Sequence, residues 1–340
     1  MSAPEFLPPF TPSRWLANRH FQTFLGTTLR RDPPLPALRR QRIELADGDF
    51  VDVDLAAARD RNRSGSWVLV LHGLEGSSRS RYVRGLAAAL LATGNEVCLM
   101  NYRGCSGEPN RLPGAYHGGA TADVLAVLEQ LSAERPGRTF AAVGFSIGAN
   151  MLMKLLGEDP ELLPAGLVAT VAISAPFDLE SCMHFLDRPS RTCGIYRRQL
   201  LKTLRTKALD KLDRFPGCIA ASPADVRATR TFAAFDELYT APIHGFRDAT
   251  DYWRCVSGAG YLSRIALPML IISAGDDPFF PRGYVPQAAI AANPHLTLAL
   301  TRRGGHCGFV GGSAWAPAYW ADRAAVGYLA RRFSPTSALP

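Results

Sequence analysis

Residues 138–159 read RTFAAVGFSIGANMLMKLLGED, a stretch that joins an apolar strand-like run to a helix-like run. Between the two runs lies Gly144-Phe145-Ser146-Ile147-Gly148, which fits the pattern G-x-S-x-G. This pattern is typical of a strained strand-to-helix turn that exposes a serine hydroxyl as a nucleophile. The alternative is a glycine-rich loop that merely contains a serine, since the chain has 30 glycines. Because the flanking runs supply the required strand and helix, we predict that Ser146 is a nucleophile.

Alternating strand and helix patterns extend in both directions from this turn. Apolar, β-branched runs predict buried strands at 66–73, 96–104, 167–176, 267–278 and 296–306. Helical patterns cover 81–94, 120–137 (with Thr121 as the expected cap) and 315–333. A β-hairpin is predicted around Asp47-Gly48. Strands separated by helices of this length predict an α/β protein with a mostly parallel central sheet flanked by helices.

Two segments depart from this alternation. Residues 1–40 are rich in Pro, Arg and aromatic residues and predict an N-terminal arm packed on the body, with a short helix around Trp15 to Phe24. Residues 176–265 contain helical patterns and no convincing buried strand. We therefore expect a core at 41–175 and 266–335, with a helical cap at 176–265 inserted between two strands of one sheet.

Two further motifs suit an acid and a base that would serve Ser146. Asp277 lies in Gly-Asp-Asp-Pro just beyond the strand run MLIISA (269–274), and His306 lies in Gly-Gly-His after the last strand run, LTLALT (296–301). The chain order Ser, Asp, His is that of α/β-hydrolases and differs from the orders in chymotrypsin and subtilisin. Asp277 is preferred as the acid for its Asp-Pro-x-x-Pro context, with Asp276 as the alternative. A surface-loop histidine is the alternative for His306.

The loop His72-Gly73-Leu74-Glu75-Gly76 follows the first strand of the predicted sheet. In this fold such a loop provides one N–H group of an oxyanion hole, and the residue after the nucleophile provides the other. We assign these N–H groups to Leu74 and Ile147. His72 is expected to support the loop by hydrogen bonding; the alternative, which we do not favour, is a catalytic base.

Other polar residues near these motifs carry weaker predictions. Cys307 is expected to be a packed, small apolar residue. Tyr116-His117-Gly118 and Asn101-Tyr102-Arg103-Gly104 either line the pocket or fix the loops around it, and we favour the structural role.

Composition narrows the function classes. The chain has 340 residues, is 47% hydrophobic and carries a formal charge of +8, which is spread along the sequence without a nucleic-acid-reading motif. The seven cysteines contain no CxxC pair, and the N-terminus lacks the pattern of a secretory leader, so we expect a cytoplasmic protein with reduced thiols. Residues 195–215 form a basic amphipathic segment, which predicts a cap helix with a solvated face; contact with a membrane surface is the alternative.

Many motifs in one order resemble the YheT-like branch of the α/β-hydrolase family, which includes bacterial relatives of the α/β-hydrolase-domain lipases and esterases. They are NRHFQTFL, HGLEGSS, NYRGCSGEPNR, AYHGG, GFSIGANML, ISAPFDLE, FDELYTAPIHGFRDATDYW, GDDPFFP and GGHCGFVGG. The resemblance implies the α/β-hydrolase fold, a triad at Ser146, Asp277 and His306, and hydrolysis of carboxylic esters. Ala149 stands where glycine is common after the elbow, which we expect the nucleophile to tolerate. The membrane anchor of some eukaryotic relatives is not seen, so a membrane-resident role is not expected.

These observations favour a serine esterase that needs neither a metal nor an organic cofactor and acts on a short-chain or lipid-like ester. An acyltransferase using the same acyl-enzyme is an alternative, and product analysis with candidate acceptors would separate the two. A non-catalytic binding protein on the same fold is a third hypothesis, which failure of all ester hydrolysis would favour. Acyl length, head group and oligomeric state stay open.

Overall fold

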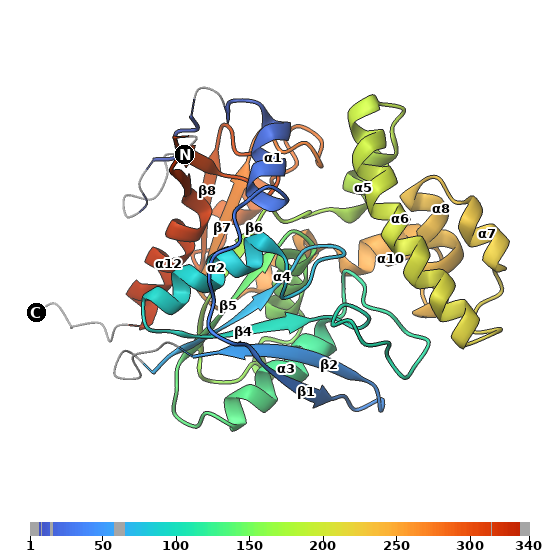
Figure 1. Cartoon of the computed structure of the whole chain (residues 1–340), viewed down its shortest axis with the longest axis horizontal. Coiled ribbons are helices and arrows are strands. Elements are labelled where there is room, and N and C mark those ends of the chain that lie inside the picture. Colours follow the sequence, from blue (N-terminus) through green and yellow to red (C-terminus); the bar gives the residue numbers. More distant parts are fainter. Residues whose placement is uncertain (1–6, 8, 14–15, 58–64, 314, 334–340) are drawn as a thin grey trace, which may run out of the picture.

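The computed structural model describes residues 7, 9–13, 16–57, 65–313 and 315–333, which build a central eight-stranded sheet (Figure 1). The strand order is β1-β2-β4-β3-β5-β6-β7-β8. The strands are β1 (Arg39–Glu44), β2 (Phe50–Ala56), β3 (Trp67–Leu71), β4 (Glu96–Asn101), β5 (Phe140–Phe145), β6 (Leu167–Ile173), β7 (Met269–Ala274) and β8 (Leu296–Thr301).

The sheet is mostly parallel, as predicted. The strands from β4 to β8 in this order pair in parallel, whereas β2 pairs antiparallel with both β1 and β4. The hairpin between β1 and β2 turns at Gly48, whose φ of 86° is favoured by glycine. Because the carboxyl ends of parallel strands meet at one edge, the loops after β3, β5, β7 and β8 gather there.

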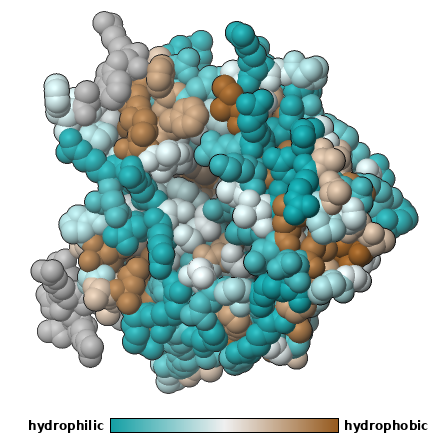
Figure 2. Space-filling view, turned by 45° about the vertical axis from the view of Figure 1, so that its right-hand side comes forward, coloured by the Kyte–Doolittle hydropathy of each residue, from teal (hydrophilic) through white to brown (hydrophobic). Residues whose placement is uncertain are grey.

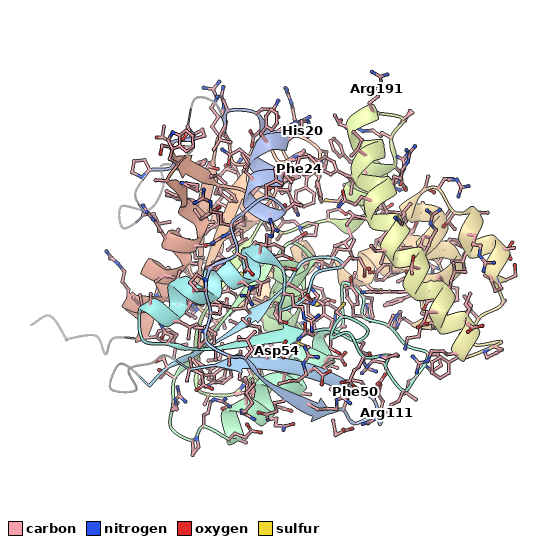
Figure 3. The ribbon with its side chains drawn as sticks, viewed as in Figure 1. His20, Phe24, Phe50, Asp54, Arg111 and Arg191 are labelled. Atoms are coloured by element: carbon pink, nitrogen blue, oxygen red, sulfur yellow. The ribbon has the colours of Figure 1, made fainter. Side chains whose placement is uncertain are left out.

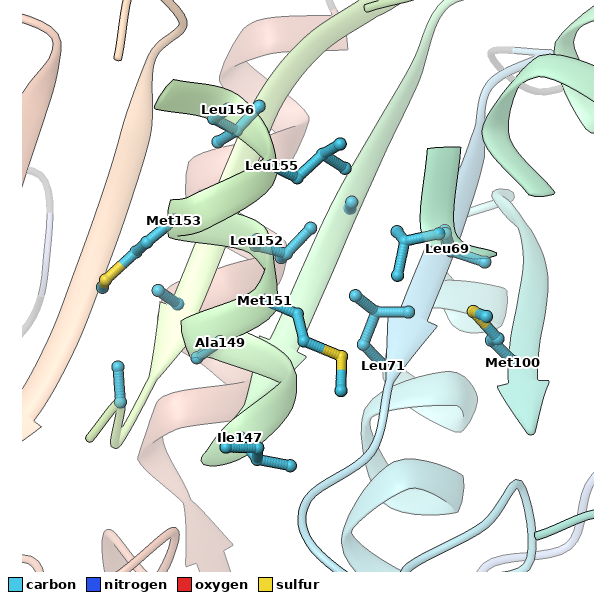
Figure 4. Close-up of a cluster of buried hydrophobic side chains, with 14 of the residues drawn as sticks. Leu69, Leu71, Met100, Ile147, Ala149, Met151, Leu152, Met153, Leu155 and Leu156 are labelled. Atoms are coloured by element: carbon cyan, nitrogen blue, oxygen red, sulfur yellow. The ribbon is translucent and has the colours of Figure 1, made fainter. Parts of the chain in front are cut away.

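Helices cover both faces of the sheet. Helix α4 packs against β5 and β6, and its residues Ile147 to Gly157 are all buried (Figure 4). An apolar helix between two sheet strands and a second helical layer is buried on every side, which explains why this segment lacks a polar face. The flanking helices are α3 (Thr121–Ala133), α4 (Ile147–Glu158) and α11 (Gln287–Ala291) in one hydrophobic cluster, and α2 (Arg81–Ala92) and α12 (Trp320–Phe333) in the other.

The segment between β6 and β7 contains helices and no strand, as the sequence predicted. These helices lie together at one side of the molecule and enclose a small hydrophobic cluster of their own, which includes Leu201 and Phe232 (Figure 1). They are α5 (Leu179–Asp187), α6 (Arg191–Arg214), α7 (Pro223–Ala228), α8 (Phe232–Phe235), η3 (Asp236–Thr240), α9 (Ala241–Ile243), α10 (Ala249–Val256) and η4 (Gly258–Arg264). We call this inserted segment the cap. The division into arm, core and cap at residues 40, 175 and 265 stays a prediction.

The surface on the cap side is mainly hydrophilic, with hydrophobic residues in scattered patches (Figure 2). Within the described part of the chain, no helix has the length and apolar character needed to cross a bilayer.

Two predicted details at helix starts were wrong. Thr121 is the first residue of α3 and not its cap; its hydroxyl instead donates to Glu158 Oε2 at 2.8 Å. The final helix begins at Trp320, because Pro317–Tyr319 form strand β10, which pairs with β9 (Val310–Gly312) after the His306 loop. Tertiary pairing overrides helix propensity there.

The N-terminal helix also starts later than predicted. Helix α1 spans Arg19–Thr27, and the Asn18 side chain caps it by accepting from two backbone N–H groups. Trp15, where the helix was expected to begin, lies outside the described residues. A short turn η2 (Pro160–Leu162) follows α4.

Candidate active site

Ser146 lies on the turn that joins β5 to α4. Its backbone has φ 53° and ψ −118°, a conformation that side chains other than glycine rarely adopt. The neighbouring strand β6 fixes one end of the turn, because the Ser146 N–H donates to Ile173 O at 2.8 Å. The hydroxyl therefore lies beyond the end of β5, at the N-terminal end of α4.

The two motif glycines are required by close packing. A Cβ atom on Gly144 would collide with the backbone of Gly148. On Gly148 it would come within 2.7 Å of His72 O and of the Tyr102 hydroxyl. Both positions therefore need glycine, which is the physical basis of the G-x-S-x-G pattern.

The structure brings the three residues proposed as a triad together. His306 Nε2 lies 2.9 Å from Ser146 Oγ, and His306 Nδ1 lies 2.8 Å from Asp277 Oδ2. His306 is 5% exposed and Asp277 is 3% exposed. A continuous hydrogen-bonded path therefore runs from the serine hydroxyl through the imidazole to a buried carboxylate.

The carboxylate decides the protonation behaviour of the imidazole. Burial disfavours the imidazolium, but attraction to Asp277 and the hydrogen bond to it outweigh burial. The pKa of His306 therefore lies above its ordinary 6.5. In its neutral form, with Nδ1–H donating to Asp277, the imidazole can take a proton from Ser146 Oγ and later return it.

Asp276, the alternative acid, points elsewhere. Its Oδ1 accepts the Gly305 N–H at 3.0 Å, so it holds the loop that carries His306 and does not contact the imidazole. Burial raises the pKa of the Asp276 carboxyl. Adjacent aspartates therefore face different partners, one the imidazole and the other the loop backbone.

Helix α1 contacts the His306 loop from the far end of the sequence. The Thr23 hydroxyl accepts the His306 N–H at 3.0 Å. The fully buried Gln22 side chain accepts from Val310 N at 2.7 Å and donates to Val310 O at 2.8 Å. Helix α1 thus fixes the loop at His306 and again at Val310. These residues belong to the NRHFQTFL motif, but no local sequence pattern indicates what they contact.

An aromatic residue, Phe279, also contributes to the site and was not predicted from the sequence. The Phe279 ring stacks on the His306 imidazole, with centroids 4.1 Å apart and planes 12° from parallel. The Phe279 N–H also donates to Asp277 Oδ1 at 2.9 Å. Phe279 therefore orients both the acid and the base, and its only sequence signal was its place in GDDPFFP.

The loop that carries Leu74 lies beside Ser146, and Ile147 follows Ser146 in the chain. A Cβ atom on Gly73 would lie 3.3 Å from Ser146 Cβ, which places the Leu74 loop against the nucleophile. Tyrosine hydroxyls accept the N–H groups on either side of Leu74, those of Gly73 at 2.8 Å and Glu75 at 2.7 Å. Within the described residues, the N–H groups of Leu74 and Ile147 have no such partner. Their role in an oxyanion hole stays a prediction.

His72 is fully buried and hydrogen-bonded to the loop. Its Nδ1 lies 2.8 Å from Gly73 O, and its Nε2 accepts the Tyr102 N–H at 3.4 Å. Burial lowers its pKa from 6.5 to about 3, which keeps the ring neutral. These contacts agree with the predicted supporting role.

The remaining polar motifs and Cys307 contact the surroundings of the site. Neither of the predicted loop clusters lines the pocket at Ser146. Tyr116 instead bonds Glu75, and Arg103 forms a two-point ion pair with Asp123. Cys307 is buried at 8% exposure in a hydrophobic cluster and also touches the pocket.

A pocket of about 220 Å³ opens above Ser146 between the sheet edge, α1 and the cap. Figure 3 shows His20 and Phe24 on α1, and both rings stack with Tyr196 of α6, so α1 also contacts the cap. Many of the pocket residues are apolar: Phe24, Leu74, Ile147, Pro176, Met183, Leu186, Leu200, Phe232, Phe279, Phe280 and Cys307. Such a lining suits a hydrocarbon chain.

Comparisons with known proteins agree with this geometry. Residues 66–313 match the model of the alpha/beta hydrolase fold. YheT of Escherichia coli (strain K12) is 40% identical over 92% of this chain and 90% of its own. The Monoacylglycerol lipase of Saccharomyces cerevisiae is 30% identical over 71% of this chain, which spans 54% of that protein. Phospholipase ABHD3 of Mus musculus is 28% identical over 89% of this chain and 74% of its own.

Solved structures support the fold independently. The esterase Pf2001 of Pyrococcus furiosus superposes with a TM-score of 0.56 at 16% identity, covering 96% of this chain and 100% of the other. At that identity the likeness concerns the fold alone. Together with the family match and the YheT relationship, it leads to one conclusion: the chain belongs to the α/β-hydrolase family, among its esterase- and lipase-like members.

Proposed function

We propose that this chain hydrolyses carboxylic esters through an acyl-enzyme formed on Ser146. The observation that carries the proposal is the hydrogen-bonded path from Ser146 Oγ through His306 to Asp277, at 2.9 and 2.8 Å. The names of the yeast and mouse relatives, a lipase and a phospholipase, support an ester substrate.

In the first half of the reaction, Ser146 Oγ attacks the ester carbonyl while His306 Nε2 takes its proton. The imidazolium that forms is stabilised by the Asp277 carboxylate. The negative oxygen of the tetrahedral intermediate accepts hydrogen bonds from the Leu74 and Ile147 N–H groups, and collapse expels the alcohol with a proton from His306. In the second half, His306 activates water, which attacks the acyl-enzyme and releases the acid.

The apolar pocket would hold the acyl chain. At about 220 Å³ it is smaller than the roughly 300–1,000 Å³ of pockets for drug-sized ligands. We therefore propose a preference for short and medium acyl chains over a long chain such as palmitate.

A panel of 4-nitrophenyl esters from acetate to palmitate tests this function. We expect turnover of the shorter esters and a decline towards palmitate, because the long chain exceeds the pocket. In the Ser146→Ala variant kcat should fall at least about 10³-fold, as expected when a nucleophile is removed. Equal turnover by wild type and variant, or no turnover of any ester, would contradict the proposal.

A further inference from the structure

The basic segment at 195–215 forms helix α6, and its charges do not all face solvent. Arg198 and Lys202 are exposed, whereas Lys211 is 6% exposed. Lys207, Lys211 and Arg214 follow one another at helical spacing and all line a second pocket, of about 330 Å³. This pocket lies beneath the cap. None of its lining residues also lines the pocket at Ser146.

Two of these cations, the buried Lys211 and the exposed Arg214, form no ion pair. Lys211 Nζ donates to the Leu112 carbonyl, and Arg214 Nη2 donates to the Asn110 carbonyl at 2.9 Å. Neither forms an ion pair with a carboxylate anywhere in the described chain. A buried ammonium group with only a carbonyl partner is costly, because burial removes its hydration. That cost also lowers the pKa of Lys211.

The other charges that line the pocket are already paired. Lys207 bonds Glu75 at 3.0 Å, Arg103 pairs with Asp123, and Glu108 pairs with Arg42. Asp210 is exposed on α6, where solvent screens its charge. Among the cations that line the pocket, Lys211 and Arg214 are therefore the two without an ion pair, although the negative charge of Asp49, which is not part of the lining, also acts on Lys211.

Two residues that line the same pocket each carry a buried polar atom without a hydrogen-bond partner. Tyr239 is 4% exposed, yet its hydroxyl is buried without a hydrogen-bond partner. His244 Nε2 is likewise buried without a hydrogen-bond partner. Buried polar atoms are satisfied in the great majority of cases, so a pair of orphans beside an uncompensated cation points to a missing ligand. Lys211 and Arg103 line the same pocket as His244, and burial together with these two positive charges lowers the pKa of His244.

We propose that this second pocket binds a compact anionic group, a carboxylate or a phosphate, of a small ligand. Lys211 and Arg214 supply the countercharge, and the Tyr239 hydroxyl donates a hydrogen bond. We call it the anion pocket.

The anion pocket adjoins the pocket at Ser146. Leu74 lines the pocket at Ser146 and its neighbour Glu75 lines the anion pocket, while on α6 Leu200 lines the former and Leu204, one turn on, the latter. The anion can therefore belong to an ester substrate or to a separate small molecule. The substrate case rests on the proposed esterase function; the binding of an anion does not.

Binding of inorganic phosphate at constant ionic strength, measured by calorimetry, tests the site directly. We expect Lys211→Met to weaken binding at least about tenfold, since it removes a charged hydrogen bond. Lys202→Met is the matched control: it removes the same charge from the exposed face of α6 and should bind as wild type does. Tyr239→Phe deletes only an unpartnered oxygen, so it should fold normally and weaken binding about fivefold.

A pair of matched esters identifies the source of the anion. Mono-4-nitrophenyl glutarate differs from 4-nitrophenyl pentanoate by a carboxylate in place of the terminal methyl group. If the anion belongs to the substrate, Lys211→Met lowers kcat/KM for the glutarate at least about tenfold more than for the pentanoate. If it belongs to a separate molecule, phosphate binding is lost while both esters are affected alike.

The proposal is overturned if neither phosphate binding nor the glutarate-to-pentanoate ratio distinguishes Lys211→Met and Tyr239→Phe from wild type. Phosphate binding is also measured on Ser146→Ala, which should bind as wild type does. A failure of the esterase proposal would therefore leave this result intact, and the two failures can be told apart.

Discussion

The Ser146 turn and the His306 loop both present a reactive side chain at the same sheet edge, but they are held in different ways. The turn is fixed by its own strand and helix, β5 and α4, by the glycines two residues before and after Ser146, and by one hydrogen bond to Ile173 O of the neighbouring strand β6. The loop is fixed by Thr23 and Gln22 of α1, more than 280 residues away in sequence. Local sequence is enough to build the nucleophile, whereas the base depends on tertiary contacts with the N-terminal helix.

The difference gives α1 a definite role. Three residues at alternate positions of the loop have positive φ: Gly305 at 61°, Cys307 at 54° and Phe309 at 48°. Such a strained backbone persists only where its surroundings over-determine it. Helix α1 supplies part of that constraint, and changes in the two regions should therefore have different consequences.

The largest effect is expected at the acid, where the loop meets its carboxylate. Asp277→Asn should lower kcat about 10³- to 10⁴-fold, because the amide favours the wrong imidazole tautomer. Loss of the carboxylate should also lower the pKa of His306, so the acid limb of the pH profile moves to lower pH. Steady-state kinetics across pH measures both effects.

Asp276→Asn is the control for this substitution, since its amide oxygen can still accept the Gly305 N–H. We expect it to stay within about tenfold of wild type. A larger loss in Asp276→Asn than in Asp277→Asn would reverse the assignment of the acid.

The next largest effect is expected in the turn. Gly144→Ala places a methyl group against the Gly148 backbone, which must shift Ser146. A displacement of about 1 Å at a reacting group costs about 10²-fold in rate, so kcat/KM should fall by that order. Gly327→Ala, where a Cβ meets nothing within 4 Å, should leave activity unchanged. Wild-type activity in Gly144→Ala would show that the turn tolerates the shift.

The smallest effect is expected at the contact between α1 and the loop. Thr23→Val removes the acceptor of the His306 N–H and leaves that buried group unpaired, at a cost of about 1–3 kcal/mol in unfolding free energy. We expect kcat/KM to fall about tenfold through misplacement of the imidazole. Chemical denaturation and steady-state kinetics measure the two effects.

Thr23→Ser keeps the hydroxyl and should restore most of both losses. If Thr23→Val matched wild type in rate and stability, the loop would not depend on α1, and the contrast between the two regions would fail.

What the sequence could predict follows the same contrast. The alternation of strands and helices and the G-x-S-x-G motif depend on near neighbours, so the parallel sheet and the position of Ser146 were predictable. The stacking of Phe279 on His306 and the hydrogen bond from Thr23 join distant segments, and no local pattern specifies them. The start of α12 was missed for the same reason, since Pro317–Tyr319 form a strand only because β9 lies beside them.

The anion pocket shows this limit most clearly. The basic amphipathic pattern of α6 predicted a solvated face, and exposed Lys202 fits it. The burial of Lys211 depends on where the cap rests on the core, which hydrophobic periodicity does not specify.

Labelling with a fluorophosphonate probe tests the central claim most directly, because the probe reacts with an activated serine and needs no knowledge of the substrate. We predict one adduct per wild-type chain, located on Ser146 by peptide mass spectrometry, and none on the Ser146→Ala variant. Undiminished labelling of Ser146→Ala, or a wild-type protein that turns over esters while Ser146 stays unmodified, would contradict the account.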